Sequence, residues 1–385
     1  MRISILKIGI MLLILLSTTG CWSKVELDEL VFVNGLYVDV GEEPDTIEVT
    51  ISTPLPNRLV SGQSSGGSSG GSDKPYFNLS KTSTSIGKAL EMLQKDLPRQ
   101  LNLSEIKVVM IGEKYGQKGM GDLLEWAKRE PSVPVGTYVV AASGKAKDAA
   151  QLTPIFEQFP IKVLMSFVEH RLMFDTTIRD FLISEAADMG VAVTHLNYES
   201  IDSAFSGSNK ETWIGIQGAA MFQNDKLKGV LGTDQAKALA WADGYIKTPI
   251  YSVKWDDGKS NADLRFTRAM GKSTVKMTNK GPVFTIHLKG RASLISKKDE
   301  MNRSTQDVTK VILTEVQKTI EDDFRNGIQT SQKEGADVLG LGLLLEWNYP
   351  SFWRNIQDRW LDYYKNEAKI NVITDIKMND YGKEN

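Results

Sequence analysis

The sequence predicts a mixed α/β and α+β protein of several domains, with an N-terminal α/β part and a C-terminal antiparallel sheet packed by long helices. Strand-like and helix-like patterns alternate over residues 21–150, which is typical of a layered sheet with parallel strand pairs. Strand-like runs dominate 210–295 and helical patterns follow them, which is typical of the α+β class. The chain has 385 residues, more than the roughly 250–300 that one hydrophobic core supports, so we expect two or three domains.

Residues 1–20 are predicted to be an export signal. Arg2 and Lys7 supply the positive charge that begins such signals, and an apolar run over 8–16 follows. That run is much shorter than the ~20 apolar residues needed to span a bilayer. Small residues then lead to a change to polar sequence, which favours a cleaved signal peptide.

The cleavage point is predicted between Gly20 and Cys21, and Cys21 is the only cysteine in the chain. We expect its thiol to carry a diacylglycerol and its new amino group an acyl chain such as palmitate. Two acyl chains anchor a protein stably where one is marginal. Bacterial lipoprotein signals usually have leucine three residues before the cysteine, whereas this chain has Thr18. An ordinary secretory signal or an uncleaved anchor is therefore the alternative.

The composition predicts a water-soluble ectodomain after the signal. The formal net charge is −2, and loss of the two cations Arg2 and Lys7 would make it −4. No basic cluster is interleaved with aromatic residues, which argues against a nucleic-acid partner. No cysteine is left to pair after Cys21, so the fold must depend on packing and not on disulfides.

The first domain is predicted over 21–150. A buried strand is expected at 30–40, and the alternation of apolar and polar residues over 47–52 predicts a strand with one wet face. Residues 61–72 are almost wholly glycine and serine, and we expect a flexible loop inserted within this domain. The remaining elements expected here are a helix at 85–97, a strand at 106–111, a helix at 119–129 and a strand at 137–142.

A small and mainly helical second lobe is predicted over 151–205. Its apolar residues recur at helical spacing in three pieces, at 155–159, 163–168 and 178–185. A polar stretch at 203–211 then separates it from the third domain, expected over 210–385.

The third domain combines a predicted hairpin, further strands and a long helix. The elements expected are a hairpin of 213–222 and 227–231 across Asn224-Asp225, a helix at 233–241, strands at 250–255, 263–267, 274–277 and 283–295, helices at 338–347 and 352–364, and a strand at 370–376. Apolar residues at every fourth position from Val308 to Ile328 predict a helix of about 25 residues with one apolar stripe. Because spacing of four drifts off a heptad seam, we expect this stripe to pack on the sheet.

No motif predicts catalysis or a metal site. The histidines at 170, 195 and 287 are scattered, without a second ligand at metal spacing. The G-x-S-x-G pattern occurs at 62–66 and 66–70, but both lie in the glycine-serine loop and lack the strand-turn-helix that strains a nucleophile. Partial glycine motifs at 271–273 and 340–342 lack a required glycine. We therefore expect no enzyme, no metal and no cofactor.

Acidic and aromatic clusters have two interpretations each. Carboxylates at 42–43, 256–257 and 321–323 could pair across a cleft, but the sequence does not pair any of them, and we expect solvated faces or turns. Trp347, Trp353 and Trp360 could rim a surface that binds a partner, but such residues more often pack helices onto a sheet.

The residues after the cysteine resemble the opening of the Ger(x)C lipoproteins, the C subunits of nutrient germinant receptors in spore-forming bacteria. That opening is similar to Gly-Cys-Trp-Asp, two basic or polar residues and Glu-Leu; here Gly20, Cys21, Trp22, Glu26 and Leu27 match it. Ser23 and Val25 depart from it. The similarity continues through 28–30 to a strand that ends with 35–39. Further similar blocks lie at 108–113, Gly119, 129–131, 144–148, 218–222, 225–227 and 229–231, then around Trp353 and Trp360.

This resemblance implies a multi-domain α/β ectodomain on the outer face of the spore inner membrane or cell membrane. It also implies two membrane-embedded partner subunits, one of them transporter-like, and it supplies no catalytic residue. We therefore expect a lipid-anchored, non-enzymatic receptor subunit that supports assembly or signalling in germination. The alternative is a lipoprotein that binds a small nutrient for a membrane transporter, which requires a deep apolar pocket with a few convergent polar groups.

Overall fold

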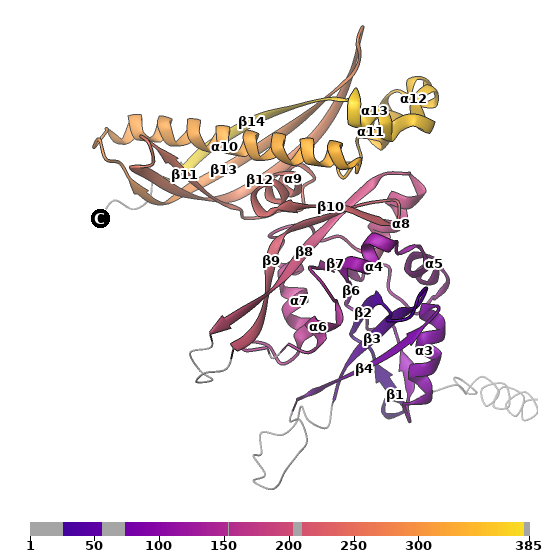
Figure 1. Ribbon diagram of the computed structural model, residues 1–385. Helices are drawn as coiled ribbons and strands as arrows, with labels where there is room; N and C mark the ends of the chain where they lie inside the picture. The colour runs from indigo at the N-terminus through magenta and orange to yellow at the C-terminus, as the bar shows by residue number, and fades with distance from the viewer. Residues whose placement is uncertain (1–25, 56–73, 153, 203–209, 381–385) are drawn as a thin grey trace, which may run out of the picture.

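The computed structural model describes residues 26–55, 74–152, 154–202 and 210–380. In that part the chain forms one eight-stranded sheet, one four-stranded sheet and one two-stranded sheet, with helices packed on them (Figure 1). The mixed α/β class that the sequence predicts is thus confirmed.

The eight-stranded sheet has the order β10-β9-β8-β7-β6-β2-β3-β4. Its centre is parallel, because β2 pairs with β6, β6 with β7 and β7 with β8 in that sense, while both flanks are antiparallel. The strands are β2 (Gly35–Val40), β3 (Ile47–Pro54), β4 (Tyr76–Ser83), β6 (Val108–Ile111), β7 (Tyr138–Ala142), β8 (Gly190–Asp202), β9 (Lys210–Gln223) and β10 (Lys226–Gly232).

Helices cover both faces of this sheet. One face packs α3 (Ile86–Lys95), α5 (Gly121–Arg129) and α8 (Ile178–Ala186), and the short α4 (Glu113–Lys118) lies at its end. The other face packs α6 (Lys147–Ala150) and α7 (Pro160–Glu169). Because both faces are covered, the expected wet face of β3 is wrong, and Thr50, Ser52 and Thr53 are buried.

Two further expectations for this half need correction. The single strand expected at 30–40 is two strands, β1 (Leu30–Phe32) and β2. The chain changes partners between them, because Val33 N donates to Asn102 O whereas Asn34 N donates to Ser52 O. β1 pairs in parallel with β5 (Gln100–Asn102) as a separate two-stranded sheet. Within 151–205, residues 155–159 form bends and no helix, and β8 belongs to the large sheet, so this segment is not a mainly helical unit. The domain boundaries themselves stay a prediction.

The four-stranded sheet has the order β11-β12-β13-β14. Its strands are β11 (Ile250–Trp255), β12 (Ser260–Thr278), β13 (Gly281–Lys298) and β14 (Lys369–Asp380). β12 runs through both strands expected at 263–267 and 274–277, because its pairing with β13 is continuous from Arg268 to Thr278. Two bulges, between Asp263 and Leu264 and between Phe266 and Arg268, lie within the first expected strand. The sheet is not purely antiparallel, since β14 returns after the helices and pairs in parallel with β13.

One side of the four-stranded sheet carries the C-terminal helices (Figure 1). They are α9 (Thr233–Ala242), α10 (Thr305–Glu334), α11 (Leu341–Asn348), α12 (Pro350–Ile356) and α13 (Trp360–Asn366). The stripe predicted on α10 is confirmed, because every residue of its four-residue spacing from Val308 to Ile328 is buried. Ser304 caps its start, and Gly335 in the left-handed conformation ends it. The helix expected at 352–364 is broken at Gln357–Arg359 into α12 and α13.

Among the described helices, we find none that combines the length and the apolar character required to cross a bilayer.

Candidate functional site

The predicted anchor lies outside the described residues. Gly20, Cys21 and Trp22 precede the first residue that the structure describes, so lipidation and signal cleavage stay predictions. Glu26 immediately precedes a short 3-10 helix, Leu27–Glu29, and the Leu27 side chain is 75% exposed. Neither residue contributes to the hydrophobic core.

The similar blocks around 35–39, 108–113 and 144–148 meet at the carboxyl ends of β2, β6 and β7. Asp39 is buried there, and its carboxylate accepts hydrogen bonds from Ala146 N at 2.8 Å and Lys147 N at 2.9 Å. A Cβ on Gly112 would stand 1.9 Å from Asp39 Oδ1. Burial raises the pKa of Asp39 despite these two backbone bonds, which oppose the shift. The carboxylate is thus committed to holding three chain segments together.

Lys147 extends this cluster toward the surface. Its Nζ lies 2.8 Å from Glu48 Oε1 on β3, and both side chains are mostly buried. The hydrogen bond that Lys147 donates to the Glu48 carboxylate raises the pKa of Lys147. All polar groups of the cluster are satisfied by neighbours in the fold, so its geometry indicates a structural role and not catalysis.

A second junction joins the segment between α4 and α5 to the β9–β10 hairpin. Met120 N donates to Asp225 O at 2.9 Å, and Gly121 N donates to Asp225 Oδ2 at 3.1 Å. Gly119 has φ +121°, and a side chain there would also meet the Asp225 carboxylate. Asn224, with φ +57°, makes the hairpin turn that the sequence predicts.

A second buried carboxylate, Asp337, lies where the two large sheets adjoin. It accepts hydrogen bonds from Leu341 N at 2.9 Å, Gly342 N at 2.8 Å and Trp360 Nε1 at 3.1 Å. Gly190 N at the start of β8 donates to Asp337 O at 3.2 Å. Burial raises the pKa of Asp337 to about 6, against the opposing effect of its hydrogen bonds. A single acid within apolar sequence is the signal that could have predicted Asp39 and Asp337.

The three C-terminal tryptophans divide between the two interpretations. Trp353 and Trp360 are buried and contact each other at a centroid distance of 5.4 Å, so they pack helices. Trp347 is 73% exposed on α11 and is available to a partner.

The histidines and acidic pairs do not assemble into a reactive site in the described chain. His195 is buried in β8, and desolvation lowers its pKa. His170 follows α7 and His287 lies on β13, and across the described ranges no group of three metal-binding side chains forms. Asp256 binds Arg303 Nη2 at 2.7 Å in a turn, as expected of a structural carboxylate. Gly271 to Ser273 lie inside β12, not in a loop before a helix. The G-x-S-x-G repeats lie outside the described residues.

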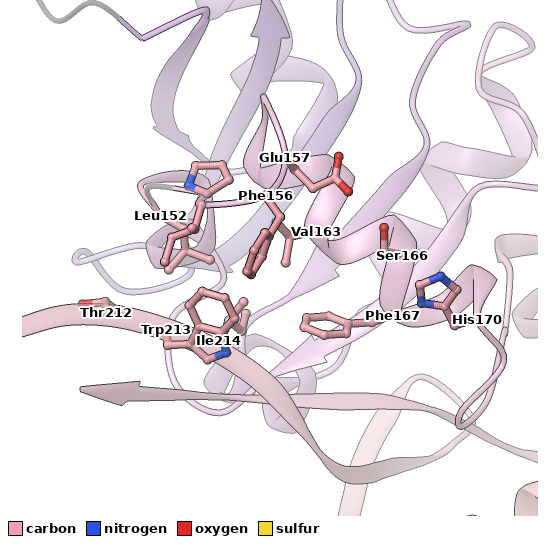
Figure 2. Close-up of a pocket in the computed structure, with 12 residues that line it drawn as sticks. Leu152, Phe156, Glu157, Val163, Ser166, Phe167, His170, Thr212, Trp213 and Ile214 are labelled. Carbon is pink, nitrogen blue, oxygen red and sulfur yellow. The ribbon is translucent and has the colours of Figure 1, made fainter. Parts of the chain in front are cut away.

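An open apolar groove lies between α7 and β9 and has a volume of about 210 Å³. Figure 2 shows Phe156 and Phe167 lining it from the helical side, with Trp213 and Ile214 from β9 opposite. Phe156 is 87% exposed, which is unusual for so large an apolar side chain. The volume is below the ~300–1,000 Å³ of most small-molecule pockets. The groove therefore suits contact with a surface more than enclosure of a nutrient.

Comparisons with known proteins identify the family. Residues 23–196 match the family model described as "Spore germination protein N-terminal domain", and residues 217–382 match "Spore germination B3/ GerAC like, C-terminal". Spore germination protein KC of Bacillus subtilis (strain 168) is 22% identical, over 98% of this chain and 95% of that protein. Spore germination protein B3 of the same organism is 23% identical, over 98% of each.

The fold comparison agrees with the family models. A crystal structure of the GerBC protein superimposes with a TM-score of 0.57 and 19% identity, covering 92% of this chain and 100% of that chain. Two family models in succession thus account for most of the sequence, on a fold already seen in a related protein. The chain belongs to the Ger(x)C family of spore germination proteins.

Proposed function

We propose that this chain is a lipid-anchored, non-enzymatic subunit of a spore nutrient germinant receptor. The observation that carries the proposal is the match of both spore germination models, in order, across nearly the whole described chain. Relatives along the full length bear the names spore germination protein B3 and A3. The subunit would support assembly or signalling of a membrane complex when a nutrient is sensed.

The anchor gives the proposal a mechanism. Cys21 precedes Glu26 by five residues, and an extended chain of that length reaches at most ~17 Å. A lipid on Cys21 would thus hold the Leu27 end of the ectodomain close to the outer face of the membrane. Confinement in that plane raises the effective concentration near membrane-embedded partners, so weak contacts suffice for assembly.

A non-enzymatic role agrees with the chemistry of three acidic residues at the junctions of the fold. Asp39, Asp225 and Asp337 each accept hydrogen bonds from backbone N–H groups within the fold. A general acid or base needs a free position within hydrogen-bond reach of a substrate, whereas both carboxylate oxygens of Asp39 and of Asp337 already accept such bonds.

The test is Cys21→Ala in the sporulating organism, followed by labelling with an alkyne fatty acid and a nutrient germination assay. We expect loss of the label, release from the membrane fraction and a germination defect through the cognate receptor. Ser23→Ala, two residues away, is the matched control and should keep both label and germination. Normal labelling and normal nutrient response in the Cys21→Ala strain would refute the anchor and its role.

Nutrient capture for a transporter is the second candidate, and the groove beside α7, although smaller than most ligand pockets, is where a nutrient would bind. Calorimetry of the purified protein with amino acids and sugars separates the two. A saturable micromolar isotherm that Trp213→Ala abolishes would favour nutrient capture. Absence of heat with these nutrients, together with co-purification of membrane subunits in detergent, would support the receptor subunit.

A further inference from the structure

The outer face of the four-stranded sheet carries a concentration of positive charge. α9 and α10 pack on the inner face, where Phe266, Phe284 and Ile286 are buried. Side chains alternate between the faces of a strand, so the intervening residues of β12, β13 and β14 point outward. The outward positions of these strands hold Arg265, Arg268, Lys272, Lys276, Lys289, Arg291, Lys369 and Lys377.

Register places three of these cations in a single row. Arg268 lies directly opposite Arg291, and Arg291 lies directly opposite Lys377. Like charges in such cross-strand positions are destabilising. All three side chains are exposed, and among the described residues none of the three forms an ion pair with a carboxylate. A protein of net charge −2 thus concentrates cations on one uncovered sheet face.

A hollow of about 210 Å³ opens within this face. Arg268, Arg291, Lys377 and Lys289 surround it, with the backbone of Gly290 as part of its lining. Asp375 is the carboxylate that lines it, opposite Lys289 in the register. Met270 at the same hollow is 42% exposed. Two guanidinium groups beside a hollow are well suited to bidentate binding of an added carboxylate.

We propose that this face binds an acidic, extended segment of a partner protein, with one carboxylate seated in the hollow between Arg268 and Arg291. Charge complementarity selects an acidic partner. The shape of the face selects a chain over a bilayer. Arg268 and Lys276, two of the outward cations of β12, are eight residues apart, which is about 27 Å along a strand at ~3.4 Å per residue. Strands twist progressively over such a length, so a flat membrane cannot contact all of the outward cations, whereas an extended chain can follow the twist and contact them.

The place of this partner in a receptor rests on the proposed function, but binding itself can be measured on the protein alone. The probe is a fluorescent (Glu-Ala)5 peptide, titrated into the full-length protein in non-ionic detergent. We expect saturable binding that weakens as salt is raised, and a loss of at least about tenfold in affinity for Arg268→Glu/Arg291→Glu. Lys310→Glu/Lys318→Glu, which makes the same charge change on the exposed side of α10, should keep affinity within about twofold.

Three results would overturn the proposal. One is failure of the wild-type protein to bind the peptide at low salt. Another is equal loss in both double variants, which would mean a general charge effect. The third is that the Cys21→Ala protein binds vesicles rich in phosphatidylglycerol but does not bind the peptide, and that Arg268→Glu/Arg291→Glu abolishes the vesicle binding. That result would mean that this face binds the membrane. Melting temperatures of the variants show whether each one is folded. Fatty-acid labelling of Cys21 tests the proposed function separately, because its outcome does not depend on peptide binding.

Discussion

The two large sheets of this protein differ in how many of their faces are covered by helices. The eight-stranded sheet has a parallel centre with helices on both faces, and even the polar residues of β3 are buried. The four-stranded sheet has helices on one face, and its other face is exposed and cationic. Parallel strands connected by helices need cover on both sides, whereas a largely antiparallel sheet tolerates water on one.

The contrast indicates where binding can evolve without loss of the core. In the first sheet, the Asp39 carboxylate accepts hydrogen bonds from two backbone N–H groups and so holds the segment after β7 against β2. In the second, Arg268, Arg291 and Lys377 make no ion pair with any described residue that would explain their placement. The first sheet therefore gives rigidity, and the second offers an unsatisfied surface.

The largest effect is expected at Asp337, where the two regions adjoin. Asp337→Ala would leave Leu341 N, Gly342 N and Trp360 Nε1 buried without their acceptor, at a cost of about 3 kcal/mol in the free energy of unfolding. Urea unfolding monitored by tryptophan fluorescence measures this loss. Asp358→Ala, which removes an exposed carboxylate in the 3-10 turn before Trp360, should change stability by less than about 0.5 kcal/mol.

The penalty at Asp337 should also depend on pH. Because its pKa is raised to about 6 in the folded protein, Asp337 holds a proton that the unfolded chain has lost between about pH 4 and pH 6. Its contribution to stability is therefore complete below about pH 4 and declines as pH rises through 6. The cost of Asp337→Ala should be larger at pH 4.5 than at pH 7. A cost that grows with pH would contradict the assigned pKa.

Much of this comparison was accessible from the sequence. The stripe from Val308 to Ile328 predicts α10 because periodicity reports a buried helix face directly. The hairpin across Asn224-Asp225 follows from turn chemistry. Local pattern does not reveal cover on the second face of β3, because that depends on where α6 packs. It also cannot show that β14, distant in sequence, pairs in parallel with β13.

The candidate sites were harder to predict than the fold. The similar blocks around Asp39, Gly112 and Ala146 are far apart in sequence, and only the parallel order of β2, β6 and β7 brings them together. The basic face depends on strand register, since Arg268, Arg291 and Lys377 look unrelated in the printed sequence. The anchor residue Cys21 remains a prediction from sequence alone.

An intermediate effect is expected within the first sheet, at the contact between Gly112 and Asp39. Gly112→Ala would place its Cβ 1.9 Å from Asp39 Oδ1 and displace the carboxylate from Ala146 N and Lys147 N. We expect a loss of about 2 kcal/mol in the free energy of unfolding. Gly136→Ala is the control, because a Cβ there meets no atom within 4 Å, and its effect should be near zero.

A double-mutant cycle sharpens this prediction. In an Asp39→Ala background the obstructing carboxylate is gone, so Gly112→Ala should cost about 1 kcal/mol less than in the wild type. Additive losses would mean that the two residues act independently and that Asp39 does not connect β6 to the segment after β7.

The smallest effect is expected on the second sheet, and it should have the opposite sign. Arg291→Glu places a carboxylate directly between Arg268 and Lys377, replacing two repulsive cross-strand pairs by attractive ones. We expect a gain of about 0.5 kcal/mol in the free energy of unfolding, together with weaker binding of the acidic peptide. Lys289→Glu is the matched variant: it faces Asp375 and should lose stability by a similar amount. If Arg291→Glu instead destabilised the protein as much as Lys289→Glu, the cations of this face would be structural, and the difference between the two sheets would not be one of unused charge.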